Sequence, residues 1–284
     1  MERAAKCIWE RYSEPLSLAD IAKSAMLSRF YLSRIFRAVA SVPPCRFLSA
    51  VRIYQAKHML VATSVSITDI SFSVGYSSVG SFTSHFTRSV GVSPTLFRRM
   101  ARDGDFEFPC PGQDSSPAHG AVQGTISLPP GHADARVYLG AFTGAVVEHR
   151  PAAAVVVDIP AGGLPSPYRL PDVPPGKWFI HAVGVTGITD PGPWTRRTAL
   201  VGGGGSVSVT AGTATRATIW LRPRRITDPP VLLALPDLET RTRRSASTED
   251  RLISPTHPDV IPAMEFRVRH GLSATNGRAS CGKS

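Results

Sequence analysis

The fold of the amino-terminal part is decided by residues 69–99, DISFSVGYSSVGSFTSHFTRSVGVSPTLFRR. Apolar residues in this stretch recur at helical spacing, and Phe82 and Phe86 stand one turn apart as core residues. Ser78 occupies the position of a helix N-cap, and Gly75 stands just before it, where the chain must turn. The stretch therefore predicts a helix-turn-helix unit that is closed by the segment GVSPTLFRR.

A similar unit is predicted earlier in the chain. Ser17 caps a short helix, MLS forms a turn, and Ser28 caps the helix SRFYLSRIFRAVA. The segments LSRFYLSRIFRAVASVPPCRFL and YSSVGSFTSHFTRSVGVSPTLF align with the same polar cap, apolar pair and trailing proline. Between the units, PPCRFLSAVRIYQAKHMLV starts with proline and predicts one long connector helix. We expect a helical bundle from Pro15 to Ala101 with two helix-turn-helix units.

Basic charge is concentrated in the same region. Residues 1–102 carry fourteen Lys and Arg against five Asp and Glu, whereas residues 103–284 carry eighteen against sixteen. A local excess of this kind points to an anionic partner. No apolar run reaches the roughly 20 residues that span a bilayer, and the four cysteines lack zinc-ligand spacing. The sequence predicts a cytoplasmic protein with no membrane partner, no metal and no cofactor.

From Leu16 to Arg99 the sequence resembles the AraC (AraC/XylS-type) family of bacterial regulators. The motif residues of that family stand at Asp69, Gly75, Tyr76, Ser78, Phe82, Phe86, Arg88, Gly91, Ser93, Pro94 and Arg98. The resemblance implies transcription regulation by sequence-specific binding to double-stranded DNA. It further implies that two recognition helices, about residues 28–39 and 78–89, enter successive major-groove segments on one face of the duplex.

The resemblance also implies which side chains contact DNA from the first recognition helix. They are Ser28, Arg29, Phe30, Ser33, Arg34 and Arg37. Arg34 is the strongest candidate for a bidentate bond to guanine, and Phe30 can pack on a thymine methyl group. The plainer interpretation of Arg34 and Arg37 is a solvated helix face, but the localised charge and the motif favour DNA contact.

The second recognition helix departs from the family pattern, which often has Gln or Arg at the contact positions. Its candidate contact residues are Ser78, Val79, Gly80, Ser81, Thr83, Ser84 and Arg88. Few of them form strong hydrogen bonds, so this helix is predicted to recognise methyl groups and DNA shape. Ser41 is a further departure, because it stands where the first unit commonly has glycine, and it is predicted to strain that turn modestly.

Beyond the helical region the composition changes. Residues 103–120 have the composition of a linker, and residues 121–236 contain short β-branched or alternating runs separated by Pro/Gly turns. These runs predict a small antiparallel β-sandwich that serves as a sensor or interaction domain. YRLPDVPPGKWFIHAVGV resembles transthyretin-like or carboxypeptidase regulatory modules. Residues 237–284 are predicted to be a disordered tail. The predicted fold class is multidomain, all-α plus all-β.

No catalytic residues are predicted. Gly202 to Gly205 lack the lysine of a phosphate-binding loop and are expected to form a flexible turn. No local motif specifies a catalytic group among Asp158, Asp172, His181 and Asp190. The aromatic side chains expected in a core more often than in a ligand pocket are Tyr168, Trp178, Phe179, Trp194 and Trp220. His58 and His85 are lone histidines on helices and are assigned no chemistry.

Two interpretations of the whole chain stay open. The first is a transcription regulator whose sandwich responds to a small-molecule or protein effector. The alternative is a sandwich that binds a ligand or protein, attached to a helical domain that binds nucleic acid without choosing sequence. Loss of preference at particular base pairs on replacing Arg34 would distinguish the first from the second.

Overall fold

The computed structural model describes residues 1–106, 118–132, 134–160, 164–187 and 199–235. These residues belong to one compact unit, with helices first and strands after them. The linker predicted at 103–120 falls mainly on residues outside the description, and the tail predicted at 237–284 falls entirely outside it. Within the described ranges, no helix is long and apolar enough to cross a membrane.

The described residues form seven helices before the first strand. Their bounds are α1 Glu2–Arg11, α2 Leu18–Ser24, α3 Arg29–Ala40, α4 Pro44–Ala62, α5 Ile67–Ser73, α6 Val79–Val90 and α7 Pro94–Asp103. Five of these helices begin at a serine whose side-chain oxygen accepts a hydrogen bond from the backbone N–H three residues later. These serines are Ser17, Ser28, Ser66, Ser78 and Ser93. Each cap satisfies a backbone donor that the helix leaves free.

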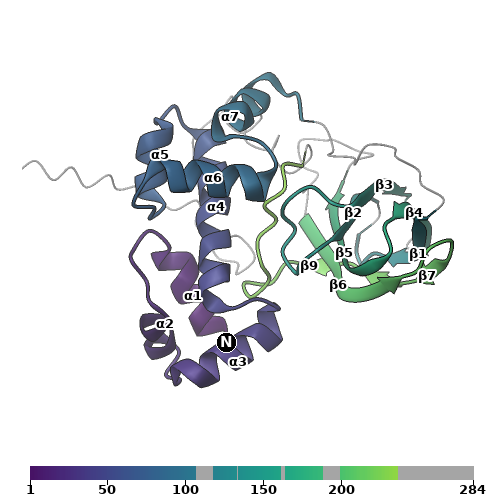
Figure 1. Cartoon of the computed structure of the whole chain (residues 1–284), viewed down its shortest axis with the longest axis horizontal. Helices are drawn as coiled ribbons and strands as arrows, with labels where there is room; N and C mark the ends of the chain where they lie inside the picture. Colours follow the sequence, from purple (N-terminus) through teal and green to yellow (C-terminus); the bar gives the residue numbers. More distant parts are fainter. Residues whose placement is uncertain (107–117, 133, 161–163, 188–198, 236–284) are drawn as a thin grey trace, which may run out of the picture. The chain divides into compact units, whose positions relative to one another are not determined.

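The long helix α4 organises the helical part. It contacts each of the other six helices, with α1 to α3 gathered at one end and α5 to α7 at the other (Figure 1). Buried side chains lie around much of its circumference, including Phe47, Val51 and Ile53, which are each fully buried. A helix that is apolar on most sides is a core helix rather than a surface helix. The predicted connector helix is therefore present, and it lies at the centre of the fold.

A helix that the sequence pattern did not predict lies before Pro15. Helix α1 buries Ala4, Ala5, Ile8 and Trp9 on one face. This spacing is helical, but Glu2 and Glu10 interrupt the apolar run, so the pattern is weak in the sequence.

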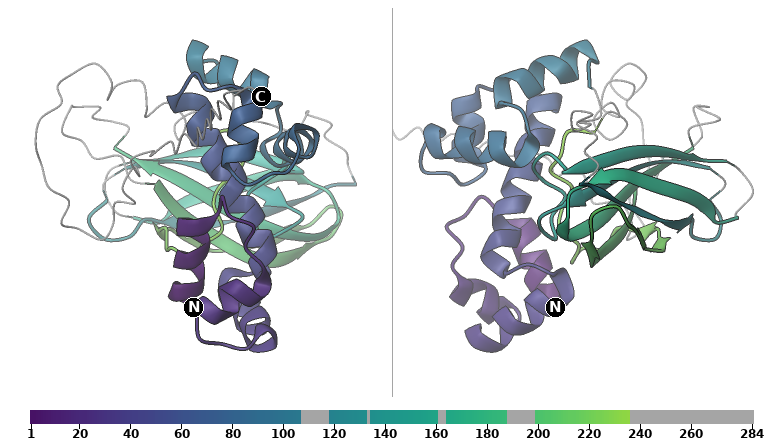
Figure 2. Two further views of the ribbon diagram at one scale, coloured as in Figure 1. Left: turned by 90° about the vertical axis from the view of Figure 1, so that its left-hand side faces the viewer. Right: turned by 45° about the vertical axis from the view of Figure 1, so that its right-hand side comes forward.

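Nine strands in two sheets lie among the described residues after the helices. Their bounds are β1 Gly120–Ser127, β2 Ala135–Phe142, β3 Ala153–Ile159, β4 Ser166–Val173, β5 Gly176–Thr186, β6 Ala199–Val209, β7 Ala214–Arg216, β8 Ile219–Trp220 and β9 Arg222–Pro223. One sheet has the order β4-β1-β7 with β8 also on β1, and the other has the order β3-β2-β5-β6-β9. Figure 2 shows the strands of both sheets from two further sides.

The two sheets share one hydrophobic core. Leu139 of β2 and Leu200 of β6 lie in the same buried cluster as Val122 of β1 and Leu170 of β4. Successive side chains of a strand point to opposite faces, so each sheet contributes alternate residues to this core.

Two expectations about the strands are wrong. The prediction of an antiparallel arrangement fails at β7 and β8, which both pair with β1 in parallel. Strand β6 belongs to one sheet, whereas β7 and β8 pair with β1 in the other. The chain therefore crosses from one sheet to the other after β6, and it then runs parallel to β1. Short strands of two or three residues carry too little pattern to reveal this direction.

Gly202 to Gly205 form part of strand β6 instead of the expected flexible turn. A Cβ atom on Gly202 would lie 2.8 Å from the carbonyl oxygen of Trp220. Gly203 has φ +81°, and its Cβ would lie 2.1 Å from the carbonyl oxygen of Ile180, where the register with β5 shifts. Glycine is required here because backbones approach closely at a bulge.

Candidate nucleic-acid interface

Helix α3 presents a basic outer face. Its inner side buries Leu32 and Phe36, which are fully enclosed in the core. The outer candidates Ser28, Arg29, Phe30, Arg34 and Arg37 are exposed, and Ser33 is half-buried. Phe30 is 86% exposed, which is unusual for a large apolar side chain. Since no acidic residue lies in α3, its three arginines have no competing anion on their own helix.

Tyr31 joins this face, although the sequence analysis did not single it out. Its ring lies under the guanidinium of Arg34, with 5.5 Å between the guanidinium carbon and the ring centroid. Tyr31 is 44% exposed, so the pair lies at the surface. The i, i+3 spacing of an aromatic and an arginine on one helix was the signal that could have identified it. Stacking restricts the rotamers of Arg34 while its N–H groups stay available to a ligand.

Helix α6 presents a smaller and mostly uncharged face. Phe82 and Phe86 are fully buried, as their spacing predicted. The exposed candidates are Ser78, Gly80, Ser81, Ser84 and Arg88, and the half-buried ones are Val79 and Thr83. The Ser78 hydroxyl accepts from the Ser81 backbone N–H at 3.3 Å and donates to the Ser81 hydroxyl at 2.9 Å. Arg88 is the one Lys or Arg in this helix.

The turn before α6 is tightly constrained. Gly75 has φ +89°, and a Cβ atom there would lie 2.9 Å from the carbonyl oxygen of Ser13 and 3.0 Å from the guanidinium of Arg52. Arg52 in turn donates to the carbonyl oxygens of Tyr12 and Glu14, at 2.7 Å each. These contacts join the turn before α6 to the loop before α2, so they fix the two halves of the helical part against each other.

Two motif positions have structural roles. Arg98 donates to the carbonyl oxygens of Leu60 and Val65. Leu60 lies in the last turn of α4, and Val65 lies in the segment between α4 and α5. The Ser66 hydroxyl donates to a carboxylate oxygen of Asp69 at 2.6 Å, at the start of α5. These side chains hold the connection between the two halves.

The turns after α3 and α6 use the same backbone conformation. Gly91 ends α6 with φ +94°, and Ser41 ends α3 with φ +61°. Ser41 thus adopts the left-handed conformation that glycine accepts more readily, as the sequence analysis predicted.

A polar network joins His85 of α6 to Tyr76 and Arg46. His85 Nδ1 is 2.5 Å from the Tyr76 hydroxyl, and its Nε2 is 3.4 Å from a guanidinium nitrogen of Arg46. Burial, and then the positive charges of Arg46, Arg88 and His149, lower the pKa of His85 to about 4. The imidazole is therefore neutral near pH 7 and does not add positive charge to this face.

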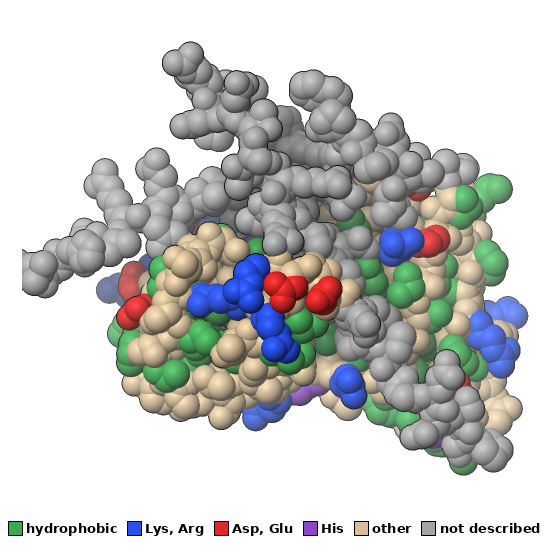
Figure 3. All heavy atoms as spheres, turned by 90° about the horizontal axis from the view of Figure 1, so that it is seen from above, with side chains coloured by type: hydrophobic (Ala, Val, Ile, Leu, Met, Phe, Trp, Pro, Cys, Tyr) green, Lys and Arg blue, Asp and Glu red, His purple; other side chains and the backbone are tan. Residues whose placement is uncertain are grey.

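Further basic side chains lie on α7. The side of the molecule that carries α7 shows a group of Lys and Arg side chains with acidic side chains beside it (Figure 3). The arginines of this helix are Arg98, Arg99 and Arg102. Arg102 pairs with Asp103 at 3.2 Å, and Arg98 is held by backbone carbonyls, so both are partly committed to the protein itself.

The residues considered for catalysis have other partners. Asp158 forms a bidentate ion pair with Arg136, and the buried His181 lies 3.1 Å from the carbonyl oxygen of Gly144. Asp190 and Trp194 lie outside the described residues. Within the ranges that are described, no group of three His, Cys, Asp or Glu residues could hold a metal ion.

The aromatic side chains of the sheets differ in environment. Tyr168 is buried in the core, whereas Trp220 is 70% exposed and lines a cavity of about 180 Å³. Val39, Ala40 and Ser41, at the end of α3, also line this cavity. The expectation of core packing therefore holds for Tyr168 and is wrong for Trp220, which lies on one of the shortest strands.

Sequence comparison matches residues 21–100 to a family model described as a helix-turn-helix domain. The lactose operon transcription activator of Staphylococcus xylosus is 31% identical over 98 residues, which are 34% of this chain and 35% of that protein. The melibiose operon regulatory protein of Escherichia coli K12 is 31% identical over 102 residues, 36% of this chain and 34% of that protein. The transcriptional activator AarP of Providencia stuartii is 32% identical over 83 residues, 29% of this chain and 62% of that protein.

This chain therefore spans only about a third of the length of the first two of these relatives. Among solved structures, a regulator from Chromobacterium violaceum with an AraC-type DNA-binding domain is 30% identical. It covers 34% of this chain and 88% of its own, with a TM-score of 0.34. The DNA-binding domain of AdpA in complex with a target DNA is 25% identical and covers 36% of this chain and 92% of its own, with a TM-score of 0.35. Residues 21–100 of this chain therefore match a helix-turn-helix domain, and they are similar in sequence to parts of named operon regulators and to a solved AraC-type DNA-binding domain.

Proposed function

We propose that the protein is a transcription regulator that binds double-stranded DNA at a specific sequence. The observation that carries this proposal is the outer face of α3, where three arginines and Phe30 are exposed on a helix that contains no acidic residue. Relatives that match this domain are named as operon regulators and transcription activators. Such a face suits the major groove, in which base edges offer hydrogen-bond acceptors and methyl groups.

In this proposal α2 with α3 and α5 with α6 are two helix-turn-helix units. Helices α3 and α6 enter successive major-groove segments, and α4 sets their separation. A helix of 19 residues is about 28 Å long, which is of the order of one turn of B-DNA. Residues 1–102 are the proposed DNA-binding domain, joined by a linker at 103–120 to a β-sandwich at 121–236 and a tail at 237–284.

In this proposal α3 and α6 make different kinds of contact with DNA. Arg34 donates two hydrogen bonds to a guanine, Phe30 packs on a thymine methyl group, and Arg29 and Arg37 contact phosphates. Val79, Gly80, Ser81, Thr83 and Ser84 contribute close, largely uncharged contact from α6, with Arg88 at a phosphate. The serine caps leave further backbone N–H groups of each helix start pointing outward, which favours phosphate oxygens.

Selection of binding sites from random duplexes with the full chain tests this proposal. The chain should enrich two sequence blocks about one helical turn apart. Replacing Arg34 with Ala should relax preference in one block by about 1–3 kcal/mol, which is roughly a 5- to 150-fold loss of discrimination. Arg169→Ala is the matched control, because it removes the same charge from an exposed position on β4.

Three outcomes are distinguishable. Loss of one block in Arg34→Ala alone supports sequence recognition by α3. A uniform loss of affinity across all duplexes, with a salt dependence reduced by about one contact, indicates phosphate binding without sequence choice. Recovery of no enriched sequence by the unsubstituted chain would overturn the proposal and favour a sandwich-based binding module.

We further propose that an effector acts through the sheets, and that a small molecule would occupy the cavity beside Trp220. Its wall includes Val39 to Ser41 of α3, so an occupant would contact the end of the first recognition helix. A screen for ligands that raise the melting temperature of the full chain tests this site. Ala145 lines the cavity, so Ala145→Trp should fill it. This variant should abolish the rise in melting temperature that the ligand causes, and it should leave DNA binding by the ligand-free protein unchanged.

A further inference from the structure

A twelve-residue segment after β9 connects the sheets to the helices. We call this segment, Arg224–Leu235, the strap. Its last five residues are all buried, and they alternate between two hydrophobic clusters. Leu232 and Ala234 belong to the cluster of the helical part, and Val231, Leu233 and Leu235 belong to a cluster with side chains of β2 and β5. An extended chain points successive side chains to opposite sides, so the strap fills both clusters at once.

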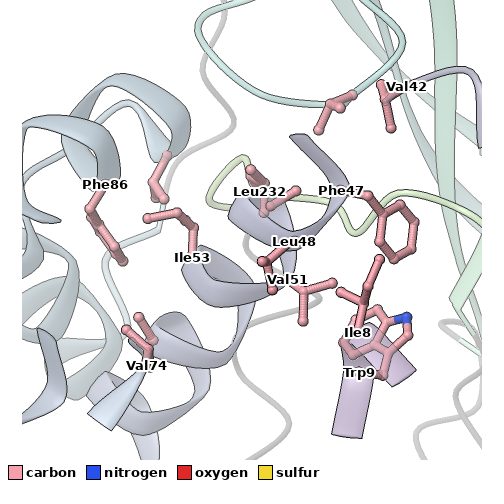
Figure 4. Close-up of a cluster of buried hydrophobic side chains, with 14 of the residues drawn as sticks. Ile8, Trp9, Val42, Phe47, Leu48, Val51, Ile53, Val74, Phe86 and Leu232 are labelled. Atoms are coloured by element: carbon pink, nitrogen blue, oxygen red, sulfur yellow. The ribbon is translucent and has the colours of Figure 1, made fainter. Parts of the chain in front are cut away.

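Leu232 lies deep in the helical cluster. It is 1% exposed, and Figure 4 draws it together with Phe47, Leu48 and Ile53 of α4. These are side chains of the connector between the two recognition helices. On its other side, Leu233 is 2% exposed and packs with Tyr138 and Val183 of the sheet. Two adjacent residues thus tie the connector helix to the sheet.

Polar contacts fix the strap at both ends. Near its start, the indole N–H of Trp9 donates to the carbonyl oxygen of Ile226 at 3.0 Å. The guanidinium of Arg224 lies 4.9 Å from the Trp9 ring centroid and 5.0 Å from that of Tyr54. Since Trp9 belongs to α1 and Tyr54 to α4, the strap holds two helices together there.

Near its end, the strap accepts a bond from a buried lysine. Lys57 of α4 is 3% exposed, and its Nζ donates to the carbonyl oxygen of Leu233 at 3.0 Å. A buried ammonium group is costly unless it is hydrogen-bonded. The backbone N–H groups of Leu232 and Leu233 donate in turn to the carbonyl oxygen of Val147, at 2.8 and 3.1 Å, in the connection between β2 and β3.

The same connection touches the helices directly. Arg46 of α4 pairs with Glu148, and the backbone N–H of His149 donates to the carbonyl oxygen of Ser89 at 3.0 Å. Ser89 lies in the last turn of α6. The connector and the second recognition helix are therefore both held by residues of the sheet-bearing part.

We propose that the strap makes the sheets and α4 one cooperative unit, so that a change in the packing of the sheets alters the stability of the connector between the recognition helices. The consequence for operator binding rests on the proposed function, whereas the coupling itself does not. The strap thereby gives the sheet-bearing part a direct physical route to the DNA-binding helices.

Hydrogen exchange measured by mass spectrometry on the full chain tests the coupling without DNA. Leu170→Ala perturbs the core between the two sheets and touches neither the strap nor a helix cluster. With the strap intact, this substitution should accelerate exchange of α4 amides around Ala56 to Leu60 at least tenfold. Should Leu170→Ala fail to fold, Ile126→Val perturbs the same core more mildly.

The decisive comparison repeats the substitution in a chain whose strap has lost its apolar contact with α4. Leu232→Ser removes the apolar contact with α4, and Leu164→Ser, at a 79% exposed position, is the matched control. In the Leu232→Ser background, Leu170→Ala should accelerate α4 exchange markedly less than it does in the Leu164→Ser background. Equal responses in the two backgrounds would overturn the proposal. Since no arm contains DNA, failure of the chain to bind any duplex would overturn the proposed function alone.

Discussion

Three glycines in and around α6 should respond differently to the same substitution. Gly75, Gly80 and Gly91 differ in backbone conformation and in the space around the missing Cβ. Gly75 has positive φ and no space, Gly91 has positive φ with nothing within 4 Å, and Gly80 is helical with nothing within 4 Å. Replacement by Ala therefore separates steric crowding from backbone strain.

The magnitudes follow from these environments. Ala in the left-handed region costs about 1–2 kcal/mol, which is the whole effect expected at Gly91. At Gly75 the contacts of 2.9 and 3.0 Å force a shift of Ser13 or Arg52, which adds about 1–3 kcal/mol. At Gly80 the helix gains up to about 1 kcal/mol, because Gly is a poorer helix former than Ala.

Thermal unfolding of the full chain measures these differences. For a chain of this size 1 kcal/mol shifts the melting temperature by about 2–4 °C. We expect Gly80→Ala to melt above the unsubstituted protein, Gly91→Ala below it and Gly75→Ala lowest. Ser41→Gly is the reciprocal control, since it relieves the left-handed strain at the equivalent turn. Finding Gly75→Ala as stable as Gly91→Ala would refute the argument from the close contacts.

Three further predictions concern helix α6. Ser78→Ala removes the cap of α6 and should lower the free energy of unfolding by about 1 kcal/mol in urea titration, while Ser77→Ala, outside the cap, should change little. His85 has a folded pKa of about 4 against about 6.5 when unfolded, so its contribution to stability is complete above pH 6.5 and is lost as pH falls toward 4. Melting curves from pH 7.5 to 4 should therefore fall less steeply for His85→Gln. Ser84→Arg places a cation on the exposed face of α6 and should raise DNA affinity several-fold, with a salt dependence steeper by about one contact; unchanged titrations would argue against DNA contact there.

The sequence revealed the helical part because its signals are local. The serine caps, the proline at the start of α4 and the spacing of Phe82 and Phe86 each act within one or two turns of chain. The left-handed conformation of Ser41 was also predictable, because Ser41 aligns with Gly91 in the repeated segments of the sequence. Helix α1 was missed because charged residues interrupt its apolar ones, although Ala4, Ile8 and Trp9 keep helical spacing.

The sheets were less accessible from sequence. Short runs of β-branched residues predicted strands, but the direction of β7 and β8 depends on where the chain returns after β6. The glycine run was taken for a turn because glycine is common in turns and at bulges alike. In the structure, the carbonyl oxygens of Trp220 and Ile180 occupy the space that side chains at Gly202 and Gly203 would need. This close approach of backbones cannot be seen in the sequence.

The sequence by itself determined where the helices begin, which of their faces is apolar and that basic charge gathers in the first 102 residues. The tertiary structure alone decided what holds those helices in place. Lys57 reads as a surface residue in a helical pattern, yet its ammonium group is buried against a carbonyl group 176 positions later in the chain. Local patterns fix local conformation through caps and periodicity, whereas a contact between distant segments exists only once both have folded against each other.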